Sequence, residues 1–499
     1  MISRAEDSPL YRLINPESIA FFGASNNIRS MGSVLMNSVR DLGYEGRLYP
    51  VHPREDEVQG YQAYRDVAGL PEVPDLAVLV LPTDQVNFVL EACGRKGIRQ
   101  AIVVSGGFKE VGGSGIEREG EMKDIAARYG MRLLGPNCIG VANPHIKLNT
   151  TPIFYEGRPG FIGLASQSGS FITQMFNYVA RMGMGFSAAF SVGNEAVTDL
   201  VDCLEYLGAC PKTRVIALYV EGITRGREFV EMARSIVPHK PIVAFYVGGS
   251  EAGKKAGLSH TGAMAGPDRL YDGIFRQGGV LRADNLAELF DFCLALGSMP
   301  LPQGRRVVIQ THSGGPGAAA ADACGRAGLD LPALSPETIE RLSGIVPSMG
   351  SLKNPVDITF TKDQSHFYRD IPEALLQEPN ADAIMTYFIM PAQVMRKRLF
   401  GPEVPDDEAL AKVRELIDAQ AAGLADMLAR YRKPLVGFTW RGIEEDLPRG
   451  LLDRGVPVFP GPERAARALA ATLTYRAFRD RISGARDQSP ADPPAHGAA

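Results

Sequence analysis

The sequence lacks the features that mark membrane, secreted and nucleic-acid-binding proteins. No apolar run approaches the roughly 18 residues that a membrane helix needs. The first residues, MISRAEDSPLYRLINPES, contain no apolar core of signal-peptide length. Six cysteines are scattered without CxxC spacing, which argues against disulfides and a thiolate zinc site, and a formal net charge of -4 gives no attraction for nucleic acid. We therefore expect a protein of the reducing cytoplasm, with no nucleic-acid or membrane partner.

Three blocks of alternating apolar and helical segments organise the sequence. Its 499 residues suit about three ordinary domains. Short apolar segments ending in Gly, Pro, Ser or Asn alternate with helical stretches, which is the pattern of parallel sheets built from βαβ units. We predict an α/β chain of three consecutive doubly wound domains at residues 1–148, 149–300 and 301–482, with a disordered tail at 483–499. The expected strands lie at residues 18–24, 47–52, 76–81, 101–105, 132–134, 161–165, 186–191, 215–220, 241–247, 279–281, 305–310, 329–331, 383–388, 434–438 and 456–459.

The strand ends of the first block favour a phosphate-binding site over a nicotinamide site. Ligands of open parallel sheets bind at the carboxyl ends of the strands. Gly23, Ala24 and Ser25 form such an end, but Ser25 and Ile28 stand at the second and third glycine positions of a dinucleotide fingerprint. No acidic residue follows the second strand to hold a ribose. A tight turn at a helix start still suits a phosphate, although a purely structural turn explains each such segment equally well.

Two further helix starts, one in each of the later blocks, are rich in glycine and serine. The segment at 166–170 is not the nucleophile elbow of a hydrolase, because GxSxG requires glycine at positions 166 and 170 and both are serine. Free backbone N–H groups at a helix start suit a phosphate, although a serine N-cap alone would also explain this segment. We expect the two starts to converge on one phosphoryl group. Their phosphate-binding residues would be Ser168, Gly169, Ser170, Gly314, Gly315 and Gly317.

A long loop at residues 253–266 lies between these helix starts and contains His260. A neutral imidazole nitrogen is basic near pH 7 and can attack phosphorus. A loop histidine by itself is more often a surface or hydrogen-bonding residue, so spacing alone assigns it no role.

At these motifs the sequence resembles the alpha part of the ADP-forming acetyl-CoA synthetases, which are relatives of succinyl-CoA synthetase. The resemblance covers residues 8–480, and the segment 259–266, SHTGAMAG, looks like the phosphohistidine loop of that family. Other similar segments follow in the same order: SGGFKE at 105–110, GPNC at 135–138, SQSG at 166–169, VGNE at 192–195, GGPG at 314–317 and NPVD at 354–357.

The resemblance implies a fold and a set of roles. The fold would be a Rossmann-like CoA-binding domain followed by two flavodoxin-like domains of the succinyl-CoA-synthetase type. His260 would carry the phosphoryl group between an acyl phosphate and ADP, with Glu221 as its acidic partner. A carboxylate that holds one imidazole N–H leaves the other nitrogen free to attack. The residues near CoA would be Gly23, Ala24, Ser25, His52, Pro53, Pro82, Ser105, Gly106 and Asn137.

Two positions depart from the family pattern, and three further residues are rival or lesser candidates for these roles. Tyr246 and Gly249 stand where many relatives have a lysine and an arginine, which puts a basic anion contact and the usual acid substrate in doubt. His312 lies beside the second glycine loop and is a rival nucleophile, although the loop motif favours His260. Asn194 and Glu195 are lesser candidates for orienting the acid or the loop.

The resemblance also implies a partner, because no ATP-grasp domain follows the third block. We expect a separate ATP-grasp beta subunit that binds ATP or ADP with Mg²⁺, in an assembly with two of each chain, and no metal ligand from this chain. CoA and a small carboxylic acid would be the other substrates. Two alternatives stay open: a synthetase for a larger aryl or branched acid, and a non-catalytic CoA-binding regulator. The presence of His260, Glu221 and both glycine loops favours an enzyme.

Overall fold

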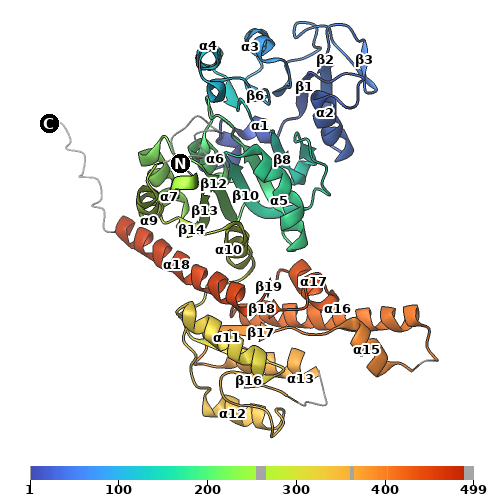
Figure 1. The fold of residues 1–499 in the computed structure, drawn as a ribbon, viewed down its shortest axis with the longest axis vertical. Coiled ribbons are helices and arrows are strands. Elements are labelled where there is room, and N and C mark those ends of the chain that lie inside the picture. The colour runs from blue at the N-terminus through green and yellow to red at the C-terminus, as the bar shows by residue number, and fades with distance from the viewer. Residues whose placement is uncertain (1, 254–265, 360–364, 402, 488–499) are drawn as a thin grey trace, which may run out of the picture.

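Three β-sheets follow one another along the chain and along the long axis of the molecule (Figure 1). The computed structural model describes residues 2–253, 266–359, 365–401 and 403–487. Within these ranges, no helix has both the length and the apolar character that crossing a lipid bilayer requires.

The first sheet has five parallel strands in the order β2-β1-β5-β6-β7. Its strands are β1 (Ser18–Phe22), β2 (Arg47–Val51), β5 (Leu76–Leu79), β6 (Gln100–Val103) and β7 (Arg132–Leu134), beside the small hairpin of β3 (Glu57–Val58) and β4 (Tyr61–Gln62). Its helices are α1 (Tyr11–Ile14), α2 (Met31–Asp41), α3 (Thr83–Lys96) and α4 (Ser114–Tyr129), with short 3-10 helices at Ala5–Asp7 and Lys109–Val111. The Ser30 side chain caps α2, and left-handed Gly97 and Gly130 end α3 and α4.

The second sheet has seven strands in the order β14-β13-β12-β10-β11-β8-β9. Its strands are β8 (Val141–Asn143), β9 (Leu148–Asn149), β10 (Pro159–Ser166), β11 (Phe186–Ser191), β12 (Val215–Val220), β13 (Ile242–Tyr246) and β14 (Leu281–Ala283). A 3-10 helix at Pro144–Ile146 joins β8 to β9, and the helices are α5 (Gly169–Arg181), α6 (Leu200–Ala209), α7 (Gly226–Ile236), α9 (Asp268–Gly278) and α10 (Leu286–Ser298). Only β8 runs against the other strands, since it pairs antiparallel with both β11 and β9. Every residue of β11 is buried, as expected for an inner strand.

The third sheet has five parallel strands in the order β16-β15-β17-β18-β19. Its strands are β15 (Val307–Thr311), β16 (Val356–Asp357), β17 (Ala383–Tyr387), β18 (Leu435–Thr439) and β19 (Val458–Pro460). Its helices are α11 (Gly314–Arg326), α12 (Pro336–Ser343), α13 (Ser365–Tyr368), α14 (Asp370–Gln377), α15 (Ala392–Leu399), α16 (Asp406–Tyr431), α17 (Asp446–Asp453) and α18 (Pro462–Asp487).

The middle unit lies between the other two (Figure 1). The third unit contacts the amino ends of the strands of the middle sheet, here called its amino edge, and the first unit contacts their carboxyl ends, its carboxyl edge. At the amino edge, Arg158 at the start of β10 pairs with Asp453 of α17 at 2.9 Å. Arg449 of α17 donates to the carbonyl of Ala180, near the end of α5, at 3.2 Å. The long helix α18 packs against both α10 and α11 and so joins the second and third units. The carboxyl edge of the second sheet, where its parallel strands end, faces the first unit.

The predicted α/β class with three successive doubly wound sheets is confirmed, and most expected strands occur within a few residues of their predicted positions. Three details differ. The strand β8 lies before the predicted boundary between residues 148 and 149, and β9 spans it, yet both pair in the second sheet, beside β11. The short strands β3, β4, β8, β9 and β16 were not predicted, and the expected strand at 329–331 is only an isolated bridge between Asp330 and Arg306.

Candidate active site

The turn after β10 forms the centre of the candidate site. The Ser166 hydroxyl donates to the Ser168 carbonyl at 2.8 Å and accepts from the Ser168 N–H at 3.1 Å, which fixes the turn. Ser168 occupies the N-cap position of α5, but its side chain makes no capping hydrogen bond. The first amides of α5, at Gly169 and Ser170, therefore remain directed at the space beyond the sheet edge. Such a helix start attracts an anion through its N–H groups and its dipole.

Glu221 lies beside this turn. β10 and β12 are neighbouring parallel strands, with Ser166 opposite Tyr219, so the residues that follow them meet at one edge. The Gln167 side chain joins the two turns: its Oε1 accepts from the N–H of Glu221 at 2.6 Å and of Gly222 at 3.0 Å. The structure thus brings predicted Glu221 together with the predicted phosphate-binding turn.

His260 lies outside the described residues, so its role stays a prediction. The described residues that flank its segment are held at the same sheet edge. Gly253 donates its N–H to Ser250 Oγ at 3.0 Å, and the Tyr246 hydroxyl donates to the Gly266 carbonyl at 3.0 Å. Tyr246 ends β13 and pairs with Val220, the residue before Glu221. The described residues on either side of the His260 segment, Gly253 and Gly266, therefore lie at the sheet edge that carries Glu221.

The two positions that depart from the family pattern have structural explanations. Tyr246 is buried and its ring stacks on Tyr271, with centroids 3.7 Å apart. A Cβ at Gly249 would come within 2.0 Å of the Asp268 carboxylate, which pairs with Arg282 at 2.6 Å. Tyr246 thus supports the turn, and a side chain at position 249 would have to displace an ion pair.

The turn after β1 is closed tightly by two glycines. Gly23 has a φ of 93°, and a Cβ there would lie 1.9 Å from the Val80 carbonyl oxygen. A Cβ at Gly32 would lie 2.1 Å from the Gly23 carbonyl oxygen, so α2 begins directly against the turn. Ser25 donates its N–H to Ser33 Oγ at 3.0 Å, which occupies one amide that had been expected near a phosphate.

The other predicted CoA-lining residues lie at the same carboxyl edge of the first sheet. His52 Nδ1 accepts from the N–H of Glu55 at 3.0 Å, so His52 and Pro53 belong to a closed turn. Ser105 Oγ exchanges two hydrogen bonds with the backbone of Leu81, at 3.0 and 2.6 Å, and this contact joins the ends of β5 and β6. The residues gathered at this edge are Gly23, Ala24, Ser25, His52, Pro53, Pro82, Ser105, Gly106 and Asn137.

Asn194, at the end of β11, connects the second sheet to this edge. Its Nδ2 donates to Glu110 at 2.6 Å and to Glu119 at 3.0 Å, and its Oδ1 accepts from Asn137 at 3.3 Å. Burial acts to raise the pKa of Glu110, but the hydrogen bonds from Asn194 and from backbone N–H groups hold that pKa below its ordinary value. The predicted CoA edge and the Glu221 edge therefore face each other across a polar contact.

Glu195 follows in a left-handed backbone conformation, with a φ of 56°. Its carboxylate accepts from Gln167 Nε2 at 2.8 Å and from the Leu200 N–H at 3.0 Å. Burial raises the pKa of Glu195 to about 7 despite these donors.

The third unit does not bring its glycine loop to this site, which corrects the expectation that both helix starts converge within one chain. Gly314, Gly315 and Gly317 begin α11 at the carboxyl end of β15. The third unit contacts the amino edge of the second sheet, whereas Ser168 lies at the carboxyl edge. The length of α5 alone, about 20 Å for its 13 residues, separates the two edges.

His312 is a poor nucleophile in this environment. Its ring stacks on Phe367, with centroids 3.5 Å apart, and burial lowers its pKa to about 3. This setting favours a packed neutral ring and keeps His260 as the preferred candidate.

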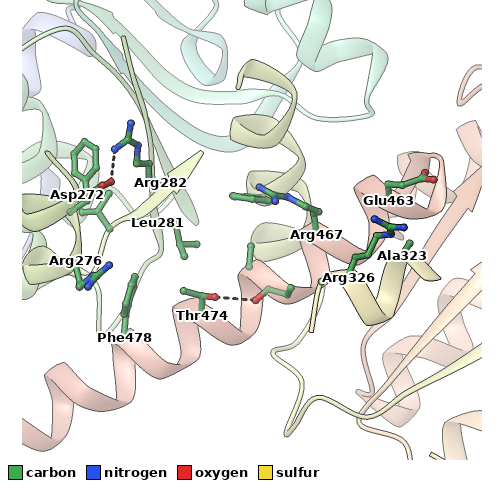
Figure 2. Close-up of a pocket in the computed structure, with 16 residues that line it drawn as sticks. Asp272, Arg276, Leu281, Arg282, Ala323, Arg326, Glu463, Arg467, Thr474 and Phe478 are labelled. Carbon is green, nitrogen blue, oxygen red and sulfur yellow. Dashed lines mark hydrogen bonds and ion pairs between the residues drawn. The ribbon is translucent and has the colours of Figure 1, made fainter. Parts of the chain in front are cut away.

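A groove of about 540 Å³ lies elsewhere, between α9, α10, α11 and α18 (Figure 2). Four arginines line it together with apolar side chains. Three of these arginines are already paired: Arg282 with Asp272, Arg326 with Asp322, and Arg467 with Glu288. None of the predicted site residues lines the groove, so it is a crevice of the domain interface.

Sequence reasoning gave no role to Gln167, Glu110 or Glu119, although all three connect the predicted residues. The first two stand within family-like segments, and their polar side chains next to strand ends were the available signal. Among the described residues, no group of three or more His, Cys, Asp or Glu side chains is arranged to hold a metal ion.

Comparisons with known proteins give the same succession of three α/β units. Three families match in succession: a CoA binding domain at residues 17–144, a succinyl-CoA ligase-like flavodoxin domain at 159–296 and a ligase-CoA domain at 307–399. The alpha subunit of acetate–CoA ligase (ADP-forming) II of Pyrococcus furiosus is 36% identical, over 92% of this chain and 96% of that protein.

Longer relatives match over only part of their length. Acetate–CoA ligase (ADP-forming) I of Archaeoglobus fulgidus is 39% identical over 77% of this chain, which is 55% of that protein. A trans-feruloyl-CoA synthase from an unknown prokaryote is 32% identical over 96% of this chain and 66% of that protein. Among solved structures, dinucleotide forming acetyl-coenzyme A synthetase 1 of Candidatus Korarchaeum cryptofilum, in complex with phosphate and ADP, superposes with a TM-score of 0.83 at 31% identity, covering 97% of this chain and 99% of that chain.

Proposed function

The chain belongs to the family of ADP-forming acetate–CoA ligase alpha subunits, acid–thiol ligases that bind CoA, and from this premise we propose how its residues divide the reaction. The edge of the first sheet binds CoA, with its phosphate at the Gly23 turn. The Ser168 turn holds the phosphoryl group carried by His260, and Glu221 holds the imidazole of that histidine. The observation that supports this most directly is the apposition of the two edges through Asn194.

The proposed reaction proceeds through two intermediates. An oxygen of inorganic phosphate attacks the thioester carbon, the C–S bond breaks, and CoA leaves as its thiol. A ring nitrogen of His260 then attacks the phosphorus of the acyl phosphate, and the carboxylic acid leaves with the bridging oxygen. ADP finally takes the phosphoryl group from histidine and becomes ATP. Glu221 accepts the imidazole N–H, and the start of α5 stabilises the charge of about −2 on the phosphoryl group.

A beta subunit of the ATP-grasp type completes the proposal, in an assembly with two of each chain. Relatives of nearly the same length are named alpha subunits, and the Archaeoglobus relative is nearly twice as long as the matched part. ATP or ADP and Mg²⁺ would be bound by that partner in the cytoplasm. The carboxylic acid is proposed to be small, as in the acetate enzymes. A larger aryl acid is the second candidate because the trans-feruloyl-CoA synthase matches nearly the whole chain.

The test is phosphorylation of the chain. The complex with an ATP-grasp partner is incubated with ATP labelled in its γ-phosphate, and acid-labile, base-stable label on this chain is measured. His260→Ala should abolish the label and His312→Ala should keep it. Label that persists in His260→Ala would contradict the assignment, and a panel of acetate, branched and aryl acids would then identify the substrate.

A further inference from the structure

The Gln167 side chain uses its full hydrogen-bonding capacity at the candidate site. An amide side chain has two N–H donors and one oxygen with two acceptor positions. Nε2 donates to Glu195 Oε2 at 2.8 Å and to the Gly222 carbonyl at 2.7 Å. Oε1 accepts from the N–H of Glu221 at 2.6 Å and of Gly222 at 3.0 Å. Rotating the amide by 180° would place its N–H groups against the backbone N–H groups and its oxygen against the acceptor oxygens. Only one orientation therefore satisfies all four bonds.

Three of these four bonds act on the backbone of Glu221 and Gly222. Glu221 follows the last residue of β12, where the sheet ladder no longer fixes the chain. Gln167 replaces the missing strand partner: it fills the donor and acceptor positions of the turn at Glu221 and Gly222. The position of the Glu221 carboxylate relative to the Ser168 turn therefore depends on this amide.

Glu195 orients the amide from the opposite side. It stands between the Leu200 N–H and Gln167 Nε2, and its left-handed φ of 56° is a conformation that a non-glycine residue keeps only when its surroundings hold it. The preceding residue, Asn194, is bonded to Glu110 of the first unit. Hydrogen bonds at Asn194 and at Glu195, joined by the peptide bond between these two residues, thus connect the CoA edge through Gln167 to the Glu221 turn.

We propose that Gln167 and Glu195 are positioning residues for the phosphoryl-transfer step: they fix the Glu221 turn beside the Ser168 turn and tie it to the docked CoA-binding unit. This inference rests on the proposed function, because it gives Glu221 its role at the phosphohistidine. Neither side chain needs to touch the reacting atoms.

The test exchanges the amide and the carboxylate between positions 167 and 195. Gln167→Ala removes all four bonds. Gln167→Glu keeps the two bonds to backbone N–H groups but sets a second carboxylate against Glu195. The double variant Gln167→Glu/Glu195→Gln restores one donor and one acceptor in reversed order. Each is measured in the complex with the ATP-grasp partner. The rate of chain phosphorylation is measured with γ-labelled ATP, the KM for CoA in the complete reaction with acid, CoA and ATP, and the melting temperature by thermal unfolding.

We expect Gln167→Ala and Gln167→Glu to lower the phosphorylation rate about 10- to 100-fold, the effect of misplacing a reacting group by about 1 Å. The double variant should recover most of that loss, with the KM for CoA unchanged throughout. Gln100→Ala is the matched control: Gln100 has similar exposure and makes one bond to the Pro9 carbonyl at 2.9 Å, far from the site.

The outcomes separate this inference from the proposed function. If the unaltered complex takes no label, the proposed function fails. If it takes label and Gln167→Ala is labelled at the same rate, only the positioning role fails. The phosphorylation rate could also fall only as far as the lower melting temperature explains, or fail to recover in the double variant. Either result would show a purely structural pair and would overturn the inference.

Discussion

At the scale of single residues, Glu221 offers the most direct chemical test. Glu221→Gln removes the negative charge but leaves the backbone bonds to Gln167 in place. We expect phosphorylation of the chain to fall by about 100-fold or more, because a neutral amide neither fixes the imidazole tautomer nor balances the developing positive charge. The control is Glu228→Gln on the exposed face of α7, which should retain full activity. Equal rates for both variants would remove Glu221 from the mechanism.

Glu195 predicts a pH dependence of stability. Burial raises its folded pKa to about 7, from 4.5, so the folded chain holds a proton between these values that the unfolded chain has lost. Stability should therefore fall as pH rises from about 4.5 to 7, by up to about 3 kcal/mol, and then level. Burial is the largest cause of the raised pKa and sets its direction; Asp199 adds to the rise, whereas Gln167, the Leu200 N–H and Lys109 oppose it.

Denaturant titrations at several pH values check this assignment. Glu195→Gln should match the unaltered chain near pH 5 and exceed its free energy of unfolding near pH 8. A difference between the two that does not change with pH would mean that another group titrates.

At the scale of elements, the strands that carry the site could be predicted and those that join the units could not. The inner strands β1, β10 and β12 are long apolar runs that end in turn residues, so burial on both faces left a clear pattern. β8, β9 and β16 have two or three residues, and their pairing depends on distant partners. The sequence of β8 therefore could not predict that this strand pairs in the second sheet.

The turn after β11 gives a prediction at this scale. Gly193 has a φ of 58°, and a Cβ there would lie 2.3 Å from the Pro136 carbonyl oxygen of the facing unit. Gly193→Ala should cost the left-handed strain of about 1 kcal/mol and also force the two edges apart. We expect a raised KM for CoA together with a lower melting temperature.

Gly130→Ala is the control for this variant, because Gly130 is also left-handed, with a φ of 62°, but has open space around its Cβ position. Gly130→Ala should lower the melting temperature through backbone strain alone and leave the KM for CoA unchanged. Equal effects of the two substitutions would mean that the contact between the edges contributes nothing.

At the scale of the whole molecule, an ion pair between a half-buried arginine and a buried carboxylate joins the second and third units. Arg464 of α18 reaches the buried Asp291 of α10 at 2.6 Å. Arg464→Ala would leave that carboxylate buried without its cation, at a cost of about 3 kcal/mol. Unfolding should then separate into two transitions, since α18 no longer couples the units. Arg464→Met/Asp291→Leu should recover much of the loss, and a single unchanged transition in Arg464→Ala would contradict this account.

The candidate site was predictable only where its residues follow strand ends. Parallel strands bring their carboxyl ends together, so Glu221 and Ser168 could be placed at one edge from the sequence. The relative placement of units depends on side-chain contacts between them, such as Arg158 with Asp453, and no local pattern encodes these. That is why the convergence of the Gly314 loop with the Ser168 turn was a wrong prediction for a single chain.

The placement of the first unit predicts how the reaction divides between subunits. The proposed CoA edge and the Glu221 turn both belong to this chain and face each other. We therefore predict that the proposed steps from acyl-CoA to phosphohistidine need no residue of a partner. The chain alone, given acyl-CoA and labelled inorganic phosphate, should become labelled and release CoA stoichiometrically, without making ATP from ADP. Adding the ATP-grasp partner with ADP and Mg²⁺ should discharge the label as ATP. His260→Ala should fail both steps. Label that appears only after the partner is added would mean that the partner completes the CoA-side site, and ATP formed by the chain alone would mean that no partner is needed.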